Sequence, residues 1–143
     1  MYKLKIFSYL PNPRVWKAII AGKICGVEVE VIGDKPANLG SWLWDFNPNI
    51  LDENERSPEH KYARKGKRGF SGVLYKTDSF LKAHPFGTVP AAFSPDGDTG
   101  IFESNSILRA VARIGKKFNL YGKDDYEASR IDSFLDANLV FAR

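Results

Sequence analysis

The chain has 143 residues, and its 21 basic and 17 acidic side chains give a formal net charge of +4. Hydrophobic residues make up 43% and charged residues 27% of the sequence, which is typical of a globular protein and excludes a disordered chain, a collagen or a transmembrane bundle. A chain of this length can bury a sizeable core as one domain, with room at most for the start of a second.

The positive excess is concentrated in one polar stretch, which contains Lys61, Arg64, Lys65, Lys67 and Arg68. Without these residues, acidic side chains outnumber basic ones by one. A nucleic-acid-binding protein is expected to spread its cations over a face and to interleave aromatic side chains with them. We therefore expect a solvated segment here, and no nucleic acid as a partner.

The N-terminus and the cysteine content indicate a cytoplasmic protein. The first residues, MYKLKIF, lack the apolar run and the cleavage site of a secretory signal, and a single cysteine cannot form an internal disulfide. No membrane is expected as a partner. His60 and His84 are far apart and have no cysteine or carboxylate at ligand spacing, so no metal site is predicted.

The first part of the chain predicts a strand, a helix and a second strand. Residues 3–9 alternate between apolar and polar and end at two prolines, as a strand does. From Arg14 to Gly26 apolar residues recur at helical spacing, and residues 27–34 alternate again. A strand, helix and strand in this order predict a right-handed unit with a parallel strand pair.

Residues 39–75 break this pattern and are predicted to be an insertion. Trp42, Trp44 and Phe46 lie at its start, and so many large apolar side chains in five positions are expected to pack on the domain. The alternative is that they form a surface for a partner. The basic stretch that follows them is expected to lie in solvent.

The rest of the chain predicts a short helix, a hairpin and two further helices. The short helix runs from Thr77 or Asp78 to residue 83, and the hairpin pairs residues 91–93 with residues 100–103. Ser104 is predicted as the N-cap of a helix that ends at Gly115, and the last helix begins near residue 124. This order, βαβ-α-ββ-α with a proline before the third strand, predicts an α/β fold of the thioredoxin-like plan. Other small α/β domains share that order, so the fold alone leaves the function open.

Two motifs resemble those of the cytosolic glutathione S-transferase superfamily. The segment HPFGTVPA at residues 84–91 is similar to the family's segment around its cis-proline, and IFESNSI at residues 101–107 is similar to its Glu/Gln-Ser motif. Within the superfamily, residues 9–12, 17–21 and 102–105 look most like the transferase-like domain of the gamma subunit of the eukaryotic translation elongation factor one complex. The resemblance implies a thioredoxin-like domain over residues 1–120, with the insertion at about 39–75. Residues 121–143 would then be the first helix of an all-α C-terminal domain, and the full-length protein a homodimer.

The resemblance also implies that glutathione is a substrate. With a cis Val89–Pro90 bond, the Val89 N–H and C=O would face outward and pair with the cysteinyl part of glutathione. A simple edge proline is the alternative reading. Glu103 would accept from the ammonium group of the γ-glutamyl part, while Ser104 and the free N–H groups of the helix start would hold its carboxylate; read locally, Ser104 is only an N-cap. Arg14 is expected to shape the site or to contact a carboxylate.

Catalysis in the family needs a hydroxyl, thiol or amide near the end of the first strand, which stabilises the glutathione thiolate. A hydrogen bond to the charged form lowers the pKa of the thiol. The candidates are Tyr9 and Ser8, followed by Asn12.

Cys25 is not expected to be the nucleophile. In a thioredoxin-like fold a catalytic cysteine lies at the start of the first helix, where the helix dipole and free N–H groups stabilise a thiolate. Cys25 lies at the other end of the predicted helix, next to Gly26 and apolar neighbours, which favour the protonated thiol. We expect it to act as a small buried hydrophobic residue.

Two functions are compatible with these observations. The first is a glutathione transferase that conjugates glutathione to an unknown electrophile, as in detoxification, or uses it in a related ether- or thioether-cleaving reaction. The second is a non-catalytic interaction module of the elongation factor one gamma type. The prolines on both sides of Asn12 and the likeness to the gamma subunit favour this second hypothesis.

Overall fold

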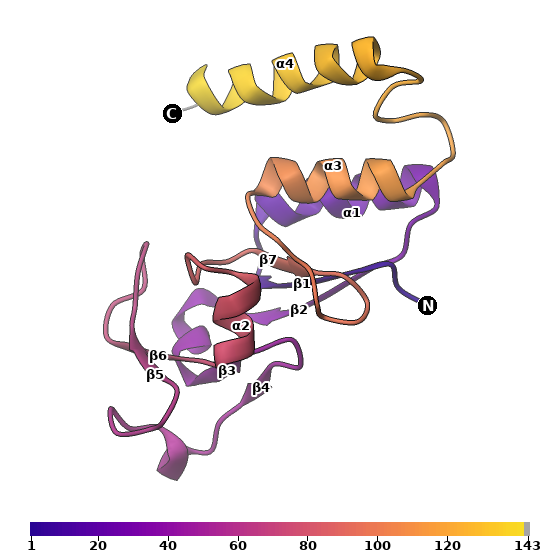
Figure 1. Ribbon diagram of the computed structural model, residues 1–143. Coiled ribbons are helices and arrows are strands. Elements are labelled where there is room, and N and C mark those ends of the chain that lie inside the picture. Colours follow the sequence, from indigo (N-terminus) through magenta and orange to yellow (C-terminus); the bar gives the residue numbers. More distant parts are fainter. Residues whose placement is uncertain (142–143) are drawn as a thin grey trace.

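The computed structural model of the chain describes residues 1–141 and begins with the predicted strand, helix and strand (Figure 1). Strand β1 (Leu4–Tyr9) is followed by helix α1 (Pro13–Cys25) and strand β2 (Val29–Asp34). The two strands pair in parallel, with Leu4 opposite Val29, as predicted. Helix α1 ends at Gly26, whose φ of +76° is a left-handed conformation that glycine adopts without steric cost.

Strands β7 (Ala91–Phe93) and β8 (Gly100–Ile101) complete the main sheet, whose strand order is β2-β1-β7-β8. Strand β7 is antiparallel to both of its neighbours, with Ala92 opposite Ile6 on one side and Ile101 on the other. The returning strand is shorter than predicted, because Phe102 and Glu103 leave the sheet before the next helix begins.

Helices α1 and α3 (Ser104–Ile114) lie side by side on one face of this sheet (Figure 1). Both present their predicted apolar faces to it. The buried residues of the resulting core cluster are Leu4, Ile6, Val15, Ala18, Ala21, Cys25, Val27, Ala92, Ile107 and Val111. The face opposite these helices is covered by α2 (Asp78–Ala83), capped by Thr77, and by the segment predicted to be an insertion (Figure 1).

That segment has a sheet of its own, which the sequence did not predict. The sheet consists of β3 (Trp42–Trp44), β4 (Asn49–Ile50), β5 (Ala63–Lys65) and β6 (Val73–Lys76), in the order β4-β3-β6-β5. Two 3₁₀ helices, η1 (Pro36–Ser41) and η2 (Glu53–Glu55), complete the segment. Its central pair, β3 and β6, is parallel, with Leu43 opposite Tyr75.

The aromatic residues at the start of the segment pack on the domain, as predicted. Trp44 is 1% exposed, and its ring contacts those of Phe7, Phe70 and Phe80 at centroid distances of 5.4–6.0 Å. Trp42 and Phe46 border the same cluster. None of residues 52–68 is buried, so the basic stretch is largely exposed. Whether residues 39–75 are an insertion relative to compact transferases stays a prediction.

Helix α4 (Asp125–Phe141) lies over α3, on the side away from the main sheet (Figure 1). Arg109 of α3 forms ion pairs with Asp132 and Asp136 of α4 at 2.8 and 2.9 Å. No residue of α4 is buried, so this helix is attached mainly by polar contacts. The last two residues of the predicted helix, 142 and 143, lie outside the described residues.

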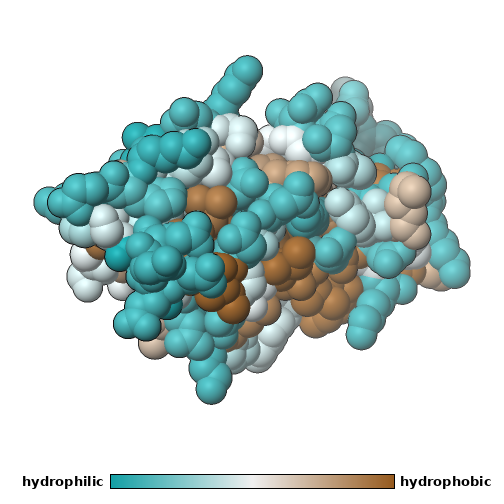
Figure 2. Space-filling model, turned by 90° about the horizontal axis from the view of Figure 1, so that it is seen from below, coloured by the Kyte–Doolittle hydropathy of each residue, from teal (hydrophilic) through white to brown (hydrophobic). Residues whose placement is uncertain are grey.

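The molecule seen from below has an apolar area bordered by hydrophilic side chains (Figure 2). Phe86 is one of the exposed apolar residues of the chain, at 58%, and its ring contacts that of Phe102.

Over residues 1–141, no helix combines the length and the apolar character that crossing a membrane requires.

Candidate functional site

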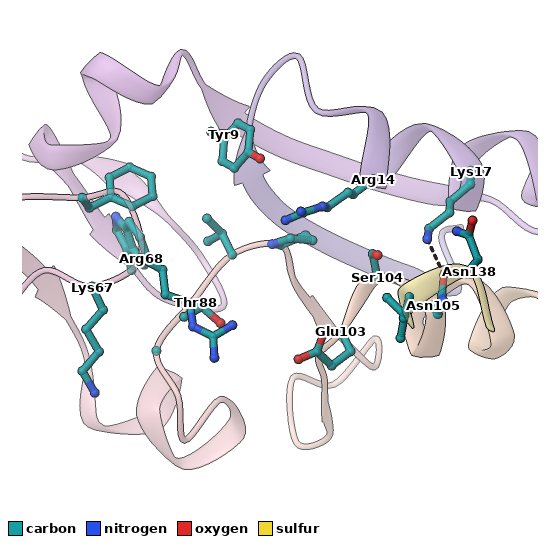
Figure 3. Close-up of a pocket in the computed structure, with 16 residues that line it drawn as sticks. Tyr9, Arg14, Lys17, Lys67, Arg68, Thr88, Glu103, Ser104, Asn105 and Asn138 are labelled. Carbon is teal, nitrogen blue, oxygen red and sulfur yellow. Dashed lines mark hydrogen bonds between the residues drawn. The ribbon is translucent and has the colours of Figure 1, made fainter. Parts of the chain in front are cut away.

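One pocket of about 470 Å³ collects most of the residues to which the sequence assigned a role (Figure 3). Tyr9 reaches it from the end of β1, Arg14 from the first turn of α1, Val89 and Pro90 from the loop before β7, and Glu103 with Ser104 from the start of α3. These segments meet because the carboxyl end of β1, the start of α1 and the start of α3 lie at the same end of the sheet (Figure 1).

Val89 offers its backbone to the pocket. The Val89–Pro90 bond is cis, and strand β7 begins only at Ala91. Within the described residues, no hydrogen bond engages the N–H or the C=O of Val89. This residue therefore presents a donor and an acceptor with which an extended ligand can pair, as an added strand does.

Glu103 and Ser104 lie at the start of α3, one residue out of the predicted register. Ser104 is the first residue of the helix, and the N-cap is Glu103, with a φ of +70° and no capping hydrogen bond from its side chain. The prediction that Ser104 is the N-cap is wrong, because the chain turns into the helix at Glu103. The Ser104 hydroxyl is thus not used for capping, and the first turn of α3, whose N–H groups have no partner within the helix, borders the pocket through Ser104 and Asn105.

The three catalytic candidates occupy different surroundings. Ser8 is fully buried, and its Oγ accepts a hydrogen bond from Asn12 Nδ2 at 3.0 Å. Asn12 is 1% exposed and caps α1, since its Oδ1 accepts from the Arg14 N–H at 3.0 Å. Neither side chain lines the pocket, whereas Tyr9 does, and no hydrogen bond within residues 1–141 engages the Tyr9 hydroxyl. The arrangement favours Tyr9 among the three.

Lys17 and Asn105, for which no role was predicted, also line the pocket. Lys17 Nζ donates a hydrogen bond to Asn105 Oδ1, and Asn105 Nδ2 donates to the Leu135 carbonyl of α4 at 3.0 Å. Partial burial, with Arg14 and Arg109 nearby, lowers the pKa of Lys17. The sequence does contain a signal for Lys17, because it follows Arg14 by three residues in the predicted helix and therefore lies on the same helix face.

The basic stretch contributes to the pocket as well. Lys67 and Arg68 lie at its end opposite α4 (Figure 3), beside Phe70. This long-range placement left no local signal in the sequence, because it depends on how the second sheet folds back over the domain. The basic stretch is largely exposed, as predicted. Two of its cations, Lys67 and Arg68, nevertheless line the candidate site.

A buried lysine supports the loop that carries Val89. Lys76 is 2% exposed, and its Nζ donates to the Gly87 carbonyl at 2.6 Å and lies 5.0 Å from the centre of the Trp44 ring. Burial, with Lys67 and Arg64 nearby, lowers the pKa of Lys76. Gly87 has a φ of +61°, and a Cβ there would lie 2.9 Å from Lys76 Nζ, so glycine suits this turn.

His84 is buried at the other end of this loop, at 1% exposure, and its ring contacts those of Phe80, Phe93 and Phe102. Neither ring nitrogen has a hydrogen-bond partner among the described residues. Burial lowers the pKa of His84 from 6.5 to about 4, so the ring is neutral at physiological pH. In the described part of the chain, no group of His, Cys, Asp and Glu side chains is arranged to hold a metal ion.

Cys25 lies outside the pocket, at the last turn of α1. It is 4% exposed and belongs to the core cluster between the sheet and the two helices, where its Sγ is 3.8 Å from the Val111 carbonyl oxygen. This position agrees with the predicted role of a small buried hydrophobic residue.

Solved structures identify the fold as that of the cytosolic glutathione S-transferases. The theta class glutathione S-transferase of Xanthomonas axonopodis pv. citri, solved with glutathione bound, matches with a TM-score of 0.58 and 18% identity, covering 99% of this chain and 50% of that one. A glutathione transferase homologue from sulfitobacter, also with bound glutathione, matches with a TM-score of 0.56 and 19% identity over 97% of this chain and 50% of that one. The predicted α/β, thioredoxin-like fold is therefore confirmed.

The sequence is similar to elongation factor 1-gamma proteins. It is 40% identical over 133 residues to probable elongation factor 1-gamma 1 of Arabidopsis thaliana and 42% identical over 133 residues to elongation factor 1-gamma 1 of Oryza sativa subsp. japonica. Each alignment covers 93% of this chain but only 23% of the relative, so the chain spans about a quarter of the length of these proteins. No protein-family model matches the chain. Both resemblances suggested by the sequence motifs, to the transferases and to the gamma subunit, are thus confirmed.

Proposed function

We propose that the pocket binds glutathione and that the protein is a glutathione transferase. The observation that carries this proposal is that the free backbone groups of Val89 face the same pocket as Glu103, Ser104 and Tyr9. The pocket thereby combines a strand-like pairing site, a site for an α-amino acid end and a phenolic hydroxyl. Both solved structures described above contain bound glutathione and share this fold.

The extended tripeptide would lie along the pocket with its γ-glutamyl end at α3. There Glu103 accepts from the ammonium group, while Ser104 and the first N–H groups of α3 donate to the carboxylate. The cysteinyl part pairs with the N–H and C=O of Val89. The glycyl carboxylate then points away from α3, toward Lys67 and Arg68.

Tyr9 is proposed as the residue that stabilises the thiolate. Its hydroxyl would donate a hydrogen bond to the glutathione sulfur, which favours the charged form and lowers the pKa of the thiol. The thiolate attacks an electrophilic atom of the second substrate; its electron pair forms the new bond to sulfur, and the leaving group departs with the pair of the broken bond. Arg14, at the start of α1, adds positive charge beside the sulfur.

Calorimetric titration with glutathione tests the binding site. Ser104→Ala removes a hydrogen bond to a charged group, which is worth about 1.5–3 kcal/mol, so the affinity should fall roughly ten- to a hundredfold. Glu103→Ala should have a similar effect. Ser106→Ala is the matched control, since Ser106 lies in the same helix turn but outside the pocket. Unchanged affinity in both Ser104→Ala and Glu103→Ala would remove the basis of the proposed site.

The second candidate is a non-catalytic interaction module of the elongation factor one gamma type. The identity of 40–42% over 93% of the chain favours it. Such a module should bind glutathione weakly or not at all, and should not change the pKa of its thiol. A titration of the bound thiol therefore distinguishes the two functions.

We also expect the full-length protein to be a cytoplasmic homodimer. The fold shared with the transferases and the apolar area in Figure 2 support an association of two copies. Sedimentation of the full-length protein at several concentrations tests the oligomeric state, and fractionation of cells that express it tests the location.

A further inference from the structure

The turn that joins β5 to β6 carries a serine close to basic residues, and the proposed function gives this serine no role. Residues 66–72 have the sequence GKRGFSG, and the Gly66 N–H donates to the Gly72 carbonyl at 2.8 Å. Arg68, Gly69 and Gly72 have φ values of 49°, 90° and 78°, so glycine supplies most of the tight geometry. The turn projects from the second sheet (Figure 1), and most of its residues are exposed.

Ser71 is the exposed hydroxyl of this turn. Within residues 1–141, no hydrogen bond engages its side chain or its backbone groups. Arg68 and Lys67 stand three and four residues before it, and both are exposed. A basophilic kinase holds such cations with carboxylates of its substrate groove, which fixes the position of the serine hydroxyl. The surroundings of Ser71 therefore suit a kinase of this kind.

Ser133 has the same sequence pattern in a different setting. It is the other serine of the chain with an arginine, Arg130, three residues before it. Ser133 lies inside α4, its Oγ donates to the Ser129 carbonyl at 3.0 Å, and Asp132 directly precedes it. An engaged hydroxyl on a helix and a neighbouring carboxylate both oppose binding in an acidic groove. The structure therefore favours Ser71 over Ser133.

The position of Ser71 connects it to the pocket. Ser71 and Arg68 line a second hollow of about 480 Å³, and Arg68 and Phe70 line both this hollow and the proposed glutathione pocket. In the binding mode proposed above, on which this inference rests, Lys67 and Arg68 hold the glycyl carboxylate; Figure 3 shows both residues at that end. Neither forms an ion pair in the described part of the chain, so both can pair with a phosphate.

We propose that Ser71 is a phosphorylation site for a basophilic serine kinase and that its phosphorylation weakens glutathione binding. The Ser71 oxygen attacks the γ-phosphorus of ATP, and the new O–P bond forms as the bond from this phosphorus to the β,γ-bridging oxygen breaks. ADP leaves with that electron pair, and the hydroxyl proton passes to a base of the kinase. The phosphoserine, with about −1.5 to −2 charges at neutral pH, pairs with Arg68 and Lys67 and repels the glycyl carboxylate.

Mass spectrometry after incubation of the full-length protein with ATP, Mg²⁺ and calmodulin-dependent protein kinase II tests the site. The tryptic peptide that contains Ser71 should gain one phosphate, and the peptide that contains Ser133 should gain none. Ser71→Ala and Arg68→Gln should each abolish the incorporation. Absence of phosphate from Ser71, while a standard peptide substrate is phosphorylated in the same reaction, would overturn the proposed site.

Titration calorimetry of the unmodified and phosphorylated proteins tests the effect on binding. The affinity for glutathione should fall about tenfold on phosphorylation, and this fall should shrink as the salt concentration rises. γ-Glutamylcysteine, which lacks the glycyl residue, should lose much less affinity. Ser71→Glu, which adds one charge, should weaken glutathione binding about threefold, whereas Ser71→Gln, of equal size, should keep the wild-type affinity.

The outcomes separate this inference from the proposed function. If the unmodified protein binds glutathione and phosphorylation leaves the affinity unchanged, the control of binding is overturned and the proposed function stands. An equal loss for glutathione and γ-glutamylcysteine would contradict an action through Lys67 and Arg68. If neither form binds glutathione, the proposed function fails and the control of binding fails with it, while the mass spectrum still decides whether Ser71 is phosphorylated.

Discussion

Replacing His84 should remove an acid-sensitive component of the protein's stability. Folding lowers the pKa of His84 from 6.5 to about 4 because the ring is buried, so between these pH values the unfolded chain binds a proton that the folded chain does not. The free energy of unfolding therefore falls as the pH falls through this window and is fully retained above pH 6.5. At pH 4.5 the loss relative to pH 7.5 is about 2.5 kcal/mol.

Urea unfolding followed by tryptophan fluorescence at pH 7.5 and pH 4.5 measures this loss in each variant. His84→Phe, which keeps an aromatic ring among Phe80, Phe93 and Phe102, should lose less stability than the wild type between the two pH values, by about 2.5 kcal/mol. Because the phenyl ring of the His84→Phe variant is larger than imidazole and can strain the core, His84→Leu serves as a second variant for the same test. His60→Gln is the control, since His60 is half-buried and lies away from this cluster. An equal pH dependence in wild type and both His84 variants would refute the reasoning.

Two further changes test other parts of the account. Cys25→Ala should retain glutathione-dependent activity, measured as conjugation rate, because the thiol is buried in the core away from the pocket; loss of turnover with fold and affinity intact would contradict this placement. Deletion of residues 52–68 should leave a cooperative thermal transition, since none of these residues is buried, but should weaken glutathione binding because Lys67 and Arg68 are removed. A broad, non-cooperative transition would show that this segment belongs to the core.

The elements of the main sheet were predictable because their signals are local. Residues 13–26 combine a proline in the first turn, apolar residues at helical spacing and a glycine at the end, and the observed helix α1 has these bounds to within a residue. The same holds for α2, which is capped by Thr77. The HPFGTVPA and IFESNSI motifs likewise predicted which loops meet at the pocket.

The second sheet and the basic end of the pocket were not predictable in this way. Strands β3 and β6 pair across 32 residues of sequence, with Leu43 opposite Tyr75, and the intervening chain has no periodicity that indicates this pairing. Without it, Lys67 and Arg68 cannot be placed near Val89. The buried hydrogen bond between Asn12 and Ser8 was also invisible, since two polar residues at the end of a strand are equally compatible with catalysis and with capping.

The most direct test of the proposed function is the pKa of the glutathione thiol in the complex, measured on the full-length protein by the ultraviolet absorbance of the thiolate as the pH is varied. If Tyr9 donates a hydrogen bond to the sulfur, the wild-type protein should lower this pKa by about one to two units, and Tyr9→Phe should return it close to the value of free glutathione. A bound thiol that titrates like the free one in the wild-type protein would contradict the account and would favour the non-catalytic module.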